Sequence, residues 1–333
     1  MTSFPTIEFG VPGDKVRVSR IGLGAMGMSA YYGSINNEES IKTLNHAIDI
    51  GCTFWDTADI YGFGANEELL SKVLKDRRQD VFVCTKFGFV IEILKKSLGK
   101  NYERPANGVC GKAEYVHKAV NASLERLGID RIDLYYQHRV DPETPIEETV
   151  GAMAELVKEG KIRYIGLSEC SADELRRAYK VHPIAAVQLE YSPWSIHVET
   201  DGLLDACREL GVTLVAYSPL GRGFLTGNIR SIDDLEEGDW RRTNPRFKPE
   251  HFANNLKLVD ALSDMAKKRN CTSGQLALAW LLTQEKNLVV IPGTRRTKYL
   301  DENFAAGQIK LTDEEIAEIR ELVNKANIQG SRY

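Results

Sequence analysis

Polar side chains suited to acid–base chemistry stand at the ends of short apolar runs in this 333-residue sequence. Asp56 follows Thr53-Phe-Trp, for example, and His138 follows Asp133-Leu-Tyr-Tyr-Gln. If the runs are parallel strands of one barrel, their ends meet on one face and bring distant residues together. Each residue alone could be an ordinary polar residue between a strand and a loop, but six in one chain favour a shared site. The six are Asp56, Lys86, His138, Ser168, Gln188 and Tyr217.

Tyr61 lies shortly after Asp56 and could reach over the same face from its loop. A lysine ammonium beside a tyrosine favours the phenolate and lowers the phenol pKa, which is ordinarily near 10. A carboxylate beside the lysine keeps that lysine charged and in place, and a neutral histidine can hydrogen-bond a carbonyl oxygen. Asp56, Tyr61, Lys86 and His138 therefore predict proton donation to an oxygen that gains charge.

The elements that must position these residues alternate along the chain. Apolar runs rich in β-branched or aromatic residues predict eight strands, and amphipathic stretches between them predict helices. The expected strands are Ile21–Gly24, Thr53–Asp56, Val81–Lys86, Ile132–His138, Tyr164–Ser168, Ala186–Glu190, Val212–Tyr217 and Leu288–Ile291. The expected helices include Glu38–Ile50, Ala113–Leu127, Pro145–Glu159, Ala172–Val181, Leu203–Leu210 and Leu256–Lys268. This alternation favours a (β/α)8 barrel over a doubly wound sheet.

No Pro/Gly-rich linker divides the chain, so a single domain is expected over residues 1–333. Two connections, Gly88–Lys112 and Gly221–Pro249, are long and follow strand ends, where barrel enzymes place their sites. The segment Thr312–Asn327 begins with a helix-capping pattern and is expected to pack outside the barrel as an extra C-terminal helix.

Composition narrows the class of partner. The 43 Lys and Arg residues nearly balance 47 Asp and Glu residues, giving a net charge of −4 without long runs of one sign. Neither nucleic acid nor a membrane surface is therefore an expected partner, and a small molecule is. Six scattered cysteines without metal-ligand spacing predict reduced thiols, and the absence of a leader-like or spanning segment predicts a cytoplasmic protein. The histidines show no metal spacing either, so no metal is expected.

A formal GxGxxG pattern at Gly22–Gly27 raises the alternative of a Rossmann dinucleotide site. That site needs a helix to open directly after the glycines, whereas Ser29–Ser34 intervenes here before the expected helix. The pattern is also compatible with a strand end that another segment of backbone approaches closely.

The ordered motifs resemble the aldo-keto reductase superfamily over nearly the whole chain. They are Gly22-Leu-Gly24, Asp56-Thr-Ala-Asp-Ile-Tyr-Gly62, Thr85-Lys-Phe87, Leu134-Tyr-Tyr-Gln-His138, Gly166-Leu-Ser-Glu169, the run Tyr217–Gly227, Ile291-Pro-Gly-Thr294 and Glu302-Asn303. The match is closest to the microbial and plant branch. The resemblance implies a (β/α)8 barrel with an N-terminal hairpin, which binds NADPH and passes hydride to a carbonyl carbon. It assigns Tyr61 as proton donor in a tetrad with Asp56, Lys86 and His138.

The resemblance also implies a set of cofactor-binding residues. Ser168 and Gln188 would contact the carboxamide, and Tyr217 would stack on the nicotinamide ring. The backbone around Gly24, Ala25 and Met26 would line the floor of that pocket, and the loop that straps the pyrophosphate would include Leu220, Gly221, Arg222 and Leu225. Guanidiniums at a helix start suit the 2′-phosphate of NADP(H). That end of the site would comprise Thr294, Arg295, Arg296, Glu302 and Asn303.

Two positions depart from the family pattern. Glu169 stands where many relatives have asparagine, which puts one amide contact to the carboxamide in doubt. Gly293 and Tyr299 replace a lysine and an arginine of the better-known branch, and the charge sits in Arg295-Arg-Thr-Lys298 instead. An alternative interpretation of this basic segment is a solvent-exposed helix start that binds no phosphate.

A second class of function stays open, because potassium-channel β subunits share the fold and cofactor but serve mainly as binding modules. They resemble this chain yet carry asparagine at the fourth tetrad position, so His138 favours turnover. An apolar substrate wall could come from Met26, Met28, Trp55, Trp194 and Phe224, although such residues are as often plain core. The substrate and the oligomeric state are not encoded in any motif.

Overall fold

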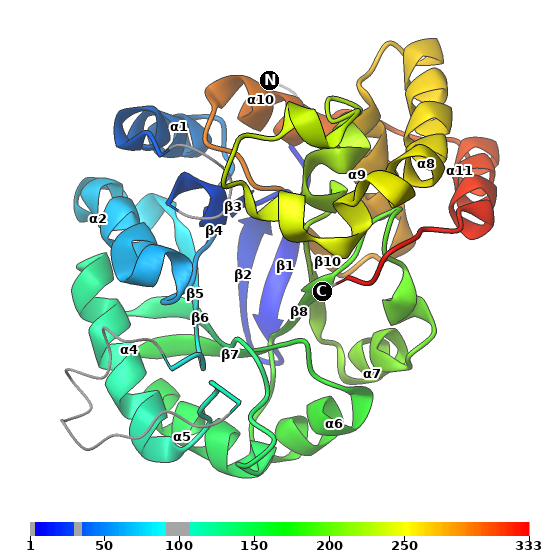
Figure 1. The fold of residues 1–333 in the computed structure, drawn as a ribbon. Coiled ribbons are helices and arrows are strands. Elements are labelled where there is room, and N and C mark those ends of the chain that lie inside the picture. Colours follow the sequence, from blue (N-terminus) through cyan, green and yellow to red (C-terminus); the bar gives the residue numbers. More distant parts are fainter. Residues whose placement is uncertain (1–3, 30–34, 91–106, 333) are drawn as a thin grey trace.

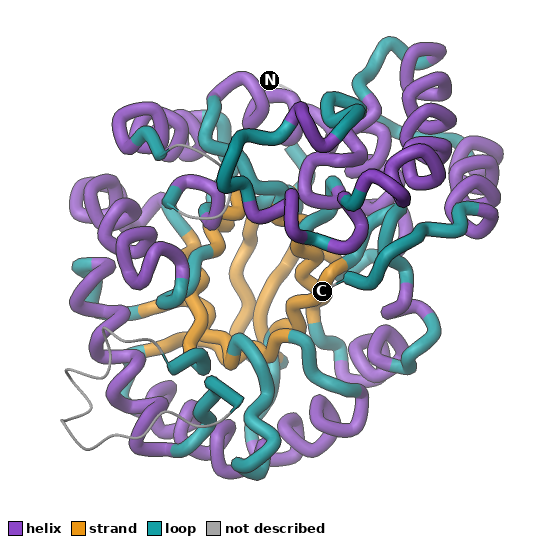
Figure 2. The backbone as a smooth tube through the Cα atoms, viewed as in Figure 1, coloured by secondary structure: helices purple, strands orange, loops and turns teal. Residues whose placement is uncertain are grey.

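The computed structural model of the chain describes residues 4–29, 35–90 and 107–332. Eight parallel strands form one sheet in which each strand pairs with its neighbour in sequence. They are β3 (Leu23–Gly24), β4 (Phe54–Asp56), β5 (Phe82–Phe87), β6 (Ile132–Gln137), β7 (Ile162–Ser168), β8 (Ala186–Glu190), β9 (Thr213–Tyr217) and β10 (Leu288–Ile291). Figures 1 and 2 show these strands as a central ring with helices around it.

The first and last strands meet, which closes the sheet into a barrel. Parallel bridges join Ile21 to Val290 and Gly24 to Gly293. A Cβ on Gly22 would lie 2.5 Å from the carbonyl oxygen of Phe54, and one on Gly24 would lie 2.9 Å from that of Ile291. The glycines are therefore explained by close approach of backbone at the closure. The predicted (β/α)8 barrel is confirmed, and the Rossmann alternative is wrong.

The helices between the strands carry the expected stop and start signals. Gly128 and Gly211 end their helices with left-handed φ values of 65° and 69°, and Ser171 and Thr312 begin theirs with capping boxes. The helices are α1 (Asn37–Asp49), α2 (Ala65–Arg77), α4 (Ala113–Leu127), α5 (Ile146–Lys158), α6 (Ala172–Val181), α7 (Leu203–Leu210), α8 (Pro249–Lys268), α9 (Ser273–Gln284), α10 (Thr297–Ala305) and α11 (Asp313–Lys325).

An N-terminal hairpin, β1 (Thr6–Val11) with β2 (Asp14–Ser19), covers the end of the barrel where the strands begin. Phe9 packs edge-on against the rings of Phe54 and Phe82, which are the first residues of β4 and β5. Because the hairpin fills this end, the mouth at the carboxyl ends of the strands is the end left for a site.

The two long connections begin at the carboxyl ends of β5 and β9. Most of the connection after β5 falls in residues 91–106, outside the described part of the chain. The connection after β9 folds into four short 3-10 turns, and α8 then begins at Pro249, earlier than the expected Leu256. The described residues include no helix that is both long and apolar enough to cross a membrane.

Candidate active site

The four residues of the predicted tetrad come together at the mouth. Asp56 ends β4, Lys86 lies near the end of β5, and His138 directly follows β6, while Tyr61 begins a short 3-10 turn after β4 (η2, Tyr61–Gly64). Strands β4, β5 and β6 are adjacent in the sheet. The parallel pairing therefore places three of these side chains on one face of the barrel, and the loop brings the fourth over it.

Lys86 is the centre of the tetrad. Its ammonium donates to Asp56 Oδ1 at 2.5 Å, to the backbone oxygen of Thr57 at 2.7 Å and to the phenol oxygen of Tyr61 at 3.4 Å. Gln188 donates its amide Nε2 to the other oxygen of Asp56 at 2.7 Å. Lys86 has no exposed surface. The ammonium is therefore fixed beneath the phenol by three oxygen contacts.

The charges of Asp56 and Lys86 depend on each other. Burial raises the pKa of Asp56, whereas the Lys86 ammonium and the Gln188 amide lower it. Burial by itself would lower the pKa of Lys86, but the Asp56 carboxylate and the Tyr61 phenol outweigh burial and raise it. We conclude that Lys86 is a permanent ammonium, held charged by its partner.

The phenol of Tyr61 is protonated in this environment. Burial raises its pKa above the ordinary value of 10, and the neighbouring Lys86 only partly offsets that rise. The sequence-based expectation of a lowered pKa is corrected here, because it weighed the ammonium without the loss of water. A protonated phenol whose conjugate base would be stabilised by Lys86 is suited to giving up its proton.

His138 faces Tyr61 across the mouth. Their ring centroids lie 5.9 Å apart in an edge-on arrangement, and the ring of Phe89 lies 5.0 Å from His138 on another side. Burial, with Lys86 and Arg139 nearby, holds the pKa of His138 well below its usual range. The imidazole is therefore neutral, and its buried Nδ1 has no hydrogen-bond partner among the residues that the structure describes.

A cavity of about 700 Å³ opens over the tetrad and runs across the mouth toward β10. It is large enough for a cofactor together with part of a substrate. Most of the residues predicted from the sequence line it. These are Gly24, Met26, Asp56, Tyr61, His138, Ser168, Gln188, Tyr217, Leu220, Arg222, Thr294, Arg295, Arg296, Glu302 and Asn303.

Four predicted residues lie behind the lining. Lys86 contacts the cavity only through Tyr61 and Asp56, as a buried charge should. Ala25 and Leu225 have no exposed surface, and a Cβ on Gly221 would lie 2.6 Å from the Trp194 ring. The side-chain positions of Ala25, Gly221 and Leu225 therefore face the core, and their predicted part in the floor and the strap would be played by the backbone.

Ser168 and Gln188 line one part of the cavity wall. Ser168 ends β7, and its buried hydroxyl has no hydrogen-bond partner among the described residues. Gln188 donates its amide to Asp56 and lines the cavity beside Ser168. Because a buried hydroxyl without a partner is costly, the Ser168 hydroxyl is a group that a ligand in the cavity could pair with.

Tyr217, at the end of β9, forms the adjoining wall. Its hydroxyl donates to Glu169 Oε1 at 2.9 Å. Glu169 itself does not line the cavity, and its backbone has a left-handed φ of 54°. The carboxylate at the usual asparagine position is thus turned toward protein partners, and it gives no direct contact in the cavity.

The far end of the cavity lies at the start of α10. Arg295 and Arg296 precede the helix, and the Arg296 amide donates to Thr294 Oγ1 at 3.1 Å. Glu302 is held from the side by the hydroxyl of Thr272 at 2.7 Å, and Asn303 is buried. Two guanidinium groups beside a helix N-terminus form an arrangement that suits a phosphate.

Sequence reasoning missed a group of lining residues. Trp240 and Arg241 come from the 3-10 turns after β9, and Phe89 and Arg139 follow strands β5 and β6. Phe89 and Arg139 each lie two residues past a strand end, so the strand-end rule could have found them. The turn residues carried no such signal, because their placement depends on tertiary contacts.

The expected apolar wall is mostly core. Of its five candidates, only Met26 lines the cavity; Met28, Trp55, Trp194 and Phe224 are buried, and Trp194 stacks on Phe224 with ring centroids 4.5 Å apart. No group of three or more metal-ligating side chains occurs within residues 4–29, 35–90 and 107–332.

The barrel mouth thus holds a buried ammonium beneath a protonated phenol, next to a neutral histidine. A family model described as "Aldo/keto reductase family" matches residues 20–324. The chain therefore belongs to the aldo/keto reductase family.

Relatives of known name agree with the family. The chain is 49% identical to "Aldo-keto reductase yakc [NADP(+)]" of Schizosaccharomyces pombe, over 99% of this chain and 95% of that protein. It is 51% identical to "Aldo-keto reductase str7" of Strobilurus tenacellus, over 95% and 92%. Among solved structures, the glycerol dehydrogenase AKR11B4 from Gluconobacter oxydans superposes with a TM-score of 0.84 at 27% identity, covering 97% of each chain. The thermostable aldo-keto reductase Tm1743, in complex with the inhibitor epalrestat, gives 0.74 at 33%, covering 96% of this chain and 99% of that one.

Proposed function

We propose that this chain reduces an aldehyde or ketone to an alcohol with NADPH, and that Tyr61 gives the proton to the carbonyl oxygen. The observation that carries the proposal is the Tyr61 hydroxyl, which lines the cavity 3.4 Å from the buried Lys86 ammonium. When hydride adds to a carbonyl carbon, negative charge develops on the carbonyl oxygen, which then needs a nearby proton donor. Among the described residues, Tyr61 is placed to supply it.

The neighbouring residues have distinct roles in this proposal. Lys86 stabilises the phenolate that Tyr61 leaves behind, and Asp56 keeps Lys86 charged and in place. His138 is neutral, so it orients the substrate oxygen by hydrogen bonding and adds no charge to the mouth. When bound, the reduced nicotinamide supplies the hydride.

The walls fit the cofactor at both ends. The Ser168 hydroxyl, which has no partner within the described part of the chain, matches the carboxamide, and Tyr217 lines the same cavity. At the other end, Arg295 and Arg296 offer the charge that a 2′-phosphate needs, which favours NADPH over NADH. The yeast relative whose name includes NADP(+) supports the same choice.

The alternative, a cofactor-binding subunit with little turnover, is less well supported. The two most similar relatives described above are named as reductases. The position that would carry asparagine in such a subunit holds His138, which faces Tyr61 over the cavity.

Activity of Tyr61→Phe tests the proposal. A panel of aldehydes and ketones is screened by loss of NADPH absorbance, and the best substrate is then given to the variant. Removal of a general acid lowers the rate about 10²- to 10⁴-fold, whereas NADPH binding, followed by protein fluorescence quenching, stays near wild type. Tyr179→Phe, which removes a hydroxyl from α6 outside the barrel, is the matched control with unchanged turnover. Wild-type turnover in Tyr61→Phe would refute the assignment.

A further inference from the structure

The last residues of the described chain return to the barrel mouth. After α11 ends at Lys325, the chain runs past α8 and stops beside the carboxyl end of β8, as Figure 1 shows. The Asn255 side chain binds the backbone of Gln329. It accepts from the backbone amide at 2.8 Å and donates to the backbone carbonyl oxygen at 3.0 Å. Asn244 donates to the carbonyl oxygen of Arg332 at 3.1 Å.

Asn244 and Asn255 are both buried, with exposed fractions of 2% and 0%. A buried amide side chain is costly unless it is paired, and here the partners are backbone groups of the C-terminal segment. Two buried asparagines therefore anchor the segment Gln329–Arg332 to the rest of the fold.

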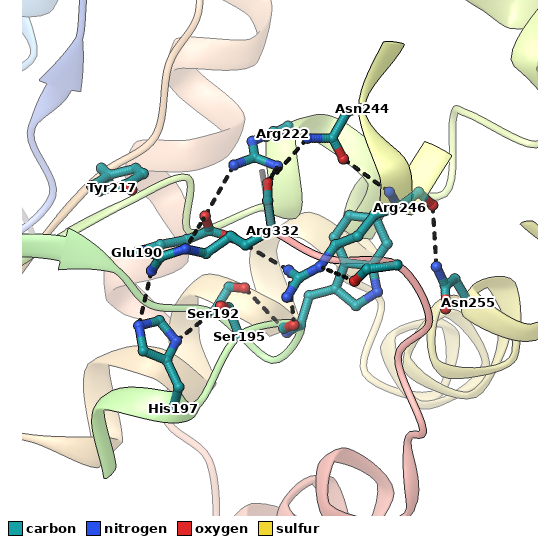
Figure 3. A network of polar contacts seen from close by, with 12 residues as sticks. Glu190, Ser192, Ser195, His197, Tyr217, Arg222, Asn244, Arg246, Asn255 and Arg332 are labelled. Carbon is teal, nitrogen blue, oxygen red and sulfur yellow. Dashed lines mark hydrogen bonds and ion pairs between the residues drawn. The ribbon is translucent and has the colours of Figure 1, made fainter. Parts of the chain in front are cut away.

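The side chain of Arg332 reaches two carboxylates. Its guanidinium forms an ion pair with Glu169, and its Nε lies 3.7 Å from Glu190 Oε2. It also contacts His197 Nε2 at 2.9 Å. Figure 3 shows Arg332, Arg222 and Arg246 converging on Glu190. Since Glu190 has only 1% exposure, this charge depends on the surrounding cations.

Glu169 links this network to the cavity. One of its oxygens accepts from the Tyr217 hydroxyl at 2.9 Å and from the Glu190 amide at 3.2 Å, and the other oxygen pairs with Arg332. Tyr217 lines the cavity, as Ser168 does. The position of the Tyr217 ring is thus tied to a residue near the end of the chain through a single carboxylate.

A second link runs through Arg222, which also lines the cavity. It donates to Glu190 Oε2 at 3.0 Å and to the backbone oxygen of Arg332 at 3.2 Å, and its guanidinium lies over the Trp240 ring. Arg332 therefore contacts Glu169 through its side chain and Arg222 through its backbone oxygen.

We propose that Arg332 is a positioning residue for cofactor binding: it fixes Glu169, Glu169 fixes Tyr217, and Tyr217 presents its ring to the nicotinamide. This inference rests on the proposed function. It also gives Glu169 a role, because the carboxylate accepts from Tyr217 with one oxygen and forms an ion pair with the Arg332 guanidinium through the other.

The test is the dissociation constant for NADPH, measured by quenching of protein fluorescence, in wild type and in Arg332→Gln. Loss of one charge-assisted contact should weaken NADPH binding about tenfold. Arg332→Lys keeps the charge without the planar guanidinium, so its NADPH dissociation constant should lie between those of wild type and Arg332→Gln. The matched control is Arg269→Gln, which removes the ion pair with Glu315 on α11, outside the mouth, and should bind NADPH as wild type does.

The coupling to Tyr217 separates positioning from a general loss of structure. Tyr217→Phe removes the hydroxyl that contacts Glu169, so Arg332→Gln should change the NADPH dissociation constant less than about twofold in that background. The proposal would be overturned if Arg332→Gln bound NADPH as tightly as wild type does. It would also be overturned if Arg332→Gln weakened NADPH binding as much in the Tyr217→Phe background as in wild type. Failure of the proposed function looks different, because wild type itself would then show no NADPH binding or no Tyr61-dependent turnover.

Discussion

The Lys86 ammonium donates to three oxygen atoms, all of which belong to the protein. Asp56 supplies a charge, the Thr57 carbonyl a dipole and Tyr61 the phenol that the ammonium acts on. In a buried site each of these interactions is stronger than it would be in water. Removal of the ammonium should therefore affect both the chemistry and the fold.

Lys86→Met tests both effects. Turnover should fall at least 10²-fold, because the Tyr61 phenolate loses its stabilising charge. The free energy of unfolding should fall by about 3–5 kcal/mol, because Asp56 becomes a buried carboxylate without a cation. Urea unfolding and NADPH oxidation measure the two effects. The double variant Lys86→Met/Asp56→Asn should regain much of the stability and none of the activity; normal turnover in either variant would contradict the coupling of Lys86 to Tyr61.

The neutral state of His138 has a consequence for stability against pH. Its folded-state pKa is depressed below the ordinary 6.5 by burial, Lys86 and Arg139, so the unfolded chain binds a proton that the folded chain does not. The free energy of unfolding is therefore unaffected by this group above pH 6.5. Below that pH it falls by up to about 1.4 kcal/mol per pH unit. Urea unfolding between pH 7.5 and 5.5 should show this slope in wild type and a smaller one in His138→Asn. Equal slopes would mean that His138 titrates normally.

Residue types and strand ends were enough to find most of the candidate site. Asp56, Lys86 and His138 stand at strand ends because a parallel barrel requires it, and that rule can be read from a sequence. Arg332 could not be found in the same way. It lies far along the chain from Glu169, in a segment without a motif, and only the folded chain brings the two together.

At the scale of elements, the glycines of the barrel are of two kinds. Gly22 lies at the closure of the barrel, where a Cβ would be 2.5 Å from the Phe54 carbonyl oxygen. Gly151 lies inside α5, and nothing comes within 4 Å of a Cβ placed there. One glycine is required by packing, and the other only adds entropy to the unfolded chain.

Alanine substitution should therefore have opposite effects at these two sites. Gly22→Ala should destabilise by about 1–3 kcal/mol, because the backbone of β4 must shift. Gly151→Ala should stabilise by about 0.4–1 kcal/mol, because the helix keeps its geometry and the unfolded chain loses freedom. Thermal or urea unfolding of the pair gives the comparison. A stable Gly22→Ala protein would show that the closure has more room than the distances allow.

Elements were predicted well where their periodicity was clear. The bounds of β8, β10, α4, α6 and α7 agree with the sequence to the residue. Helix α9, in contrast, is buried on nearly all sides, so its sequence lacks the polar face that marks a helix. The turns after β9 were expected only as a long connection, because contacts such as Arg241 to the Arg222 carbonyl, at 3.0 Å, decide their shape.

At the scale of the whole molecule, the cavity connects groups that no single element carries. Its tetrad end is built from β4, β5 and β6, and its far end from the start of α10. A ligand that spans the cavity ties these elements together and stabilises the folded state by mass action. The stabilisation measures binding without any turnover.

Cofactor preference should appear in that stabilisation. At 100 times its dissociation constant, NADPH should add about 2.7 kcal/mol to the free energy of unfolding. NADH lacks the phosphate and therefore contacts worth about 1.5–3 kcal/mol, so at the same concentration it should add only about 0.3–1.3 kcal/mol. Arg295→Ala and Arg296→Ala should reduce the NADPH value toward the NADH value. Arg176→Ala, which breaks an exposed pair with Glu209 on the outer helices, should leave both unchanged. Equal stabilisation of wild type by the two cofactors, or a preference that survives both arginine substitutions, would place the phosphate elsewhere or show that it is not recognised.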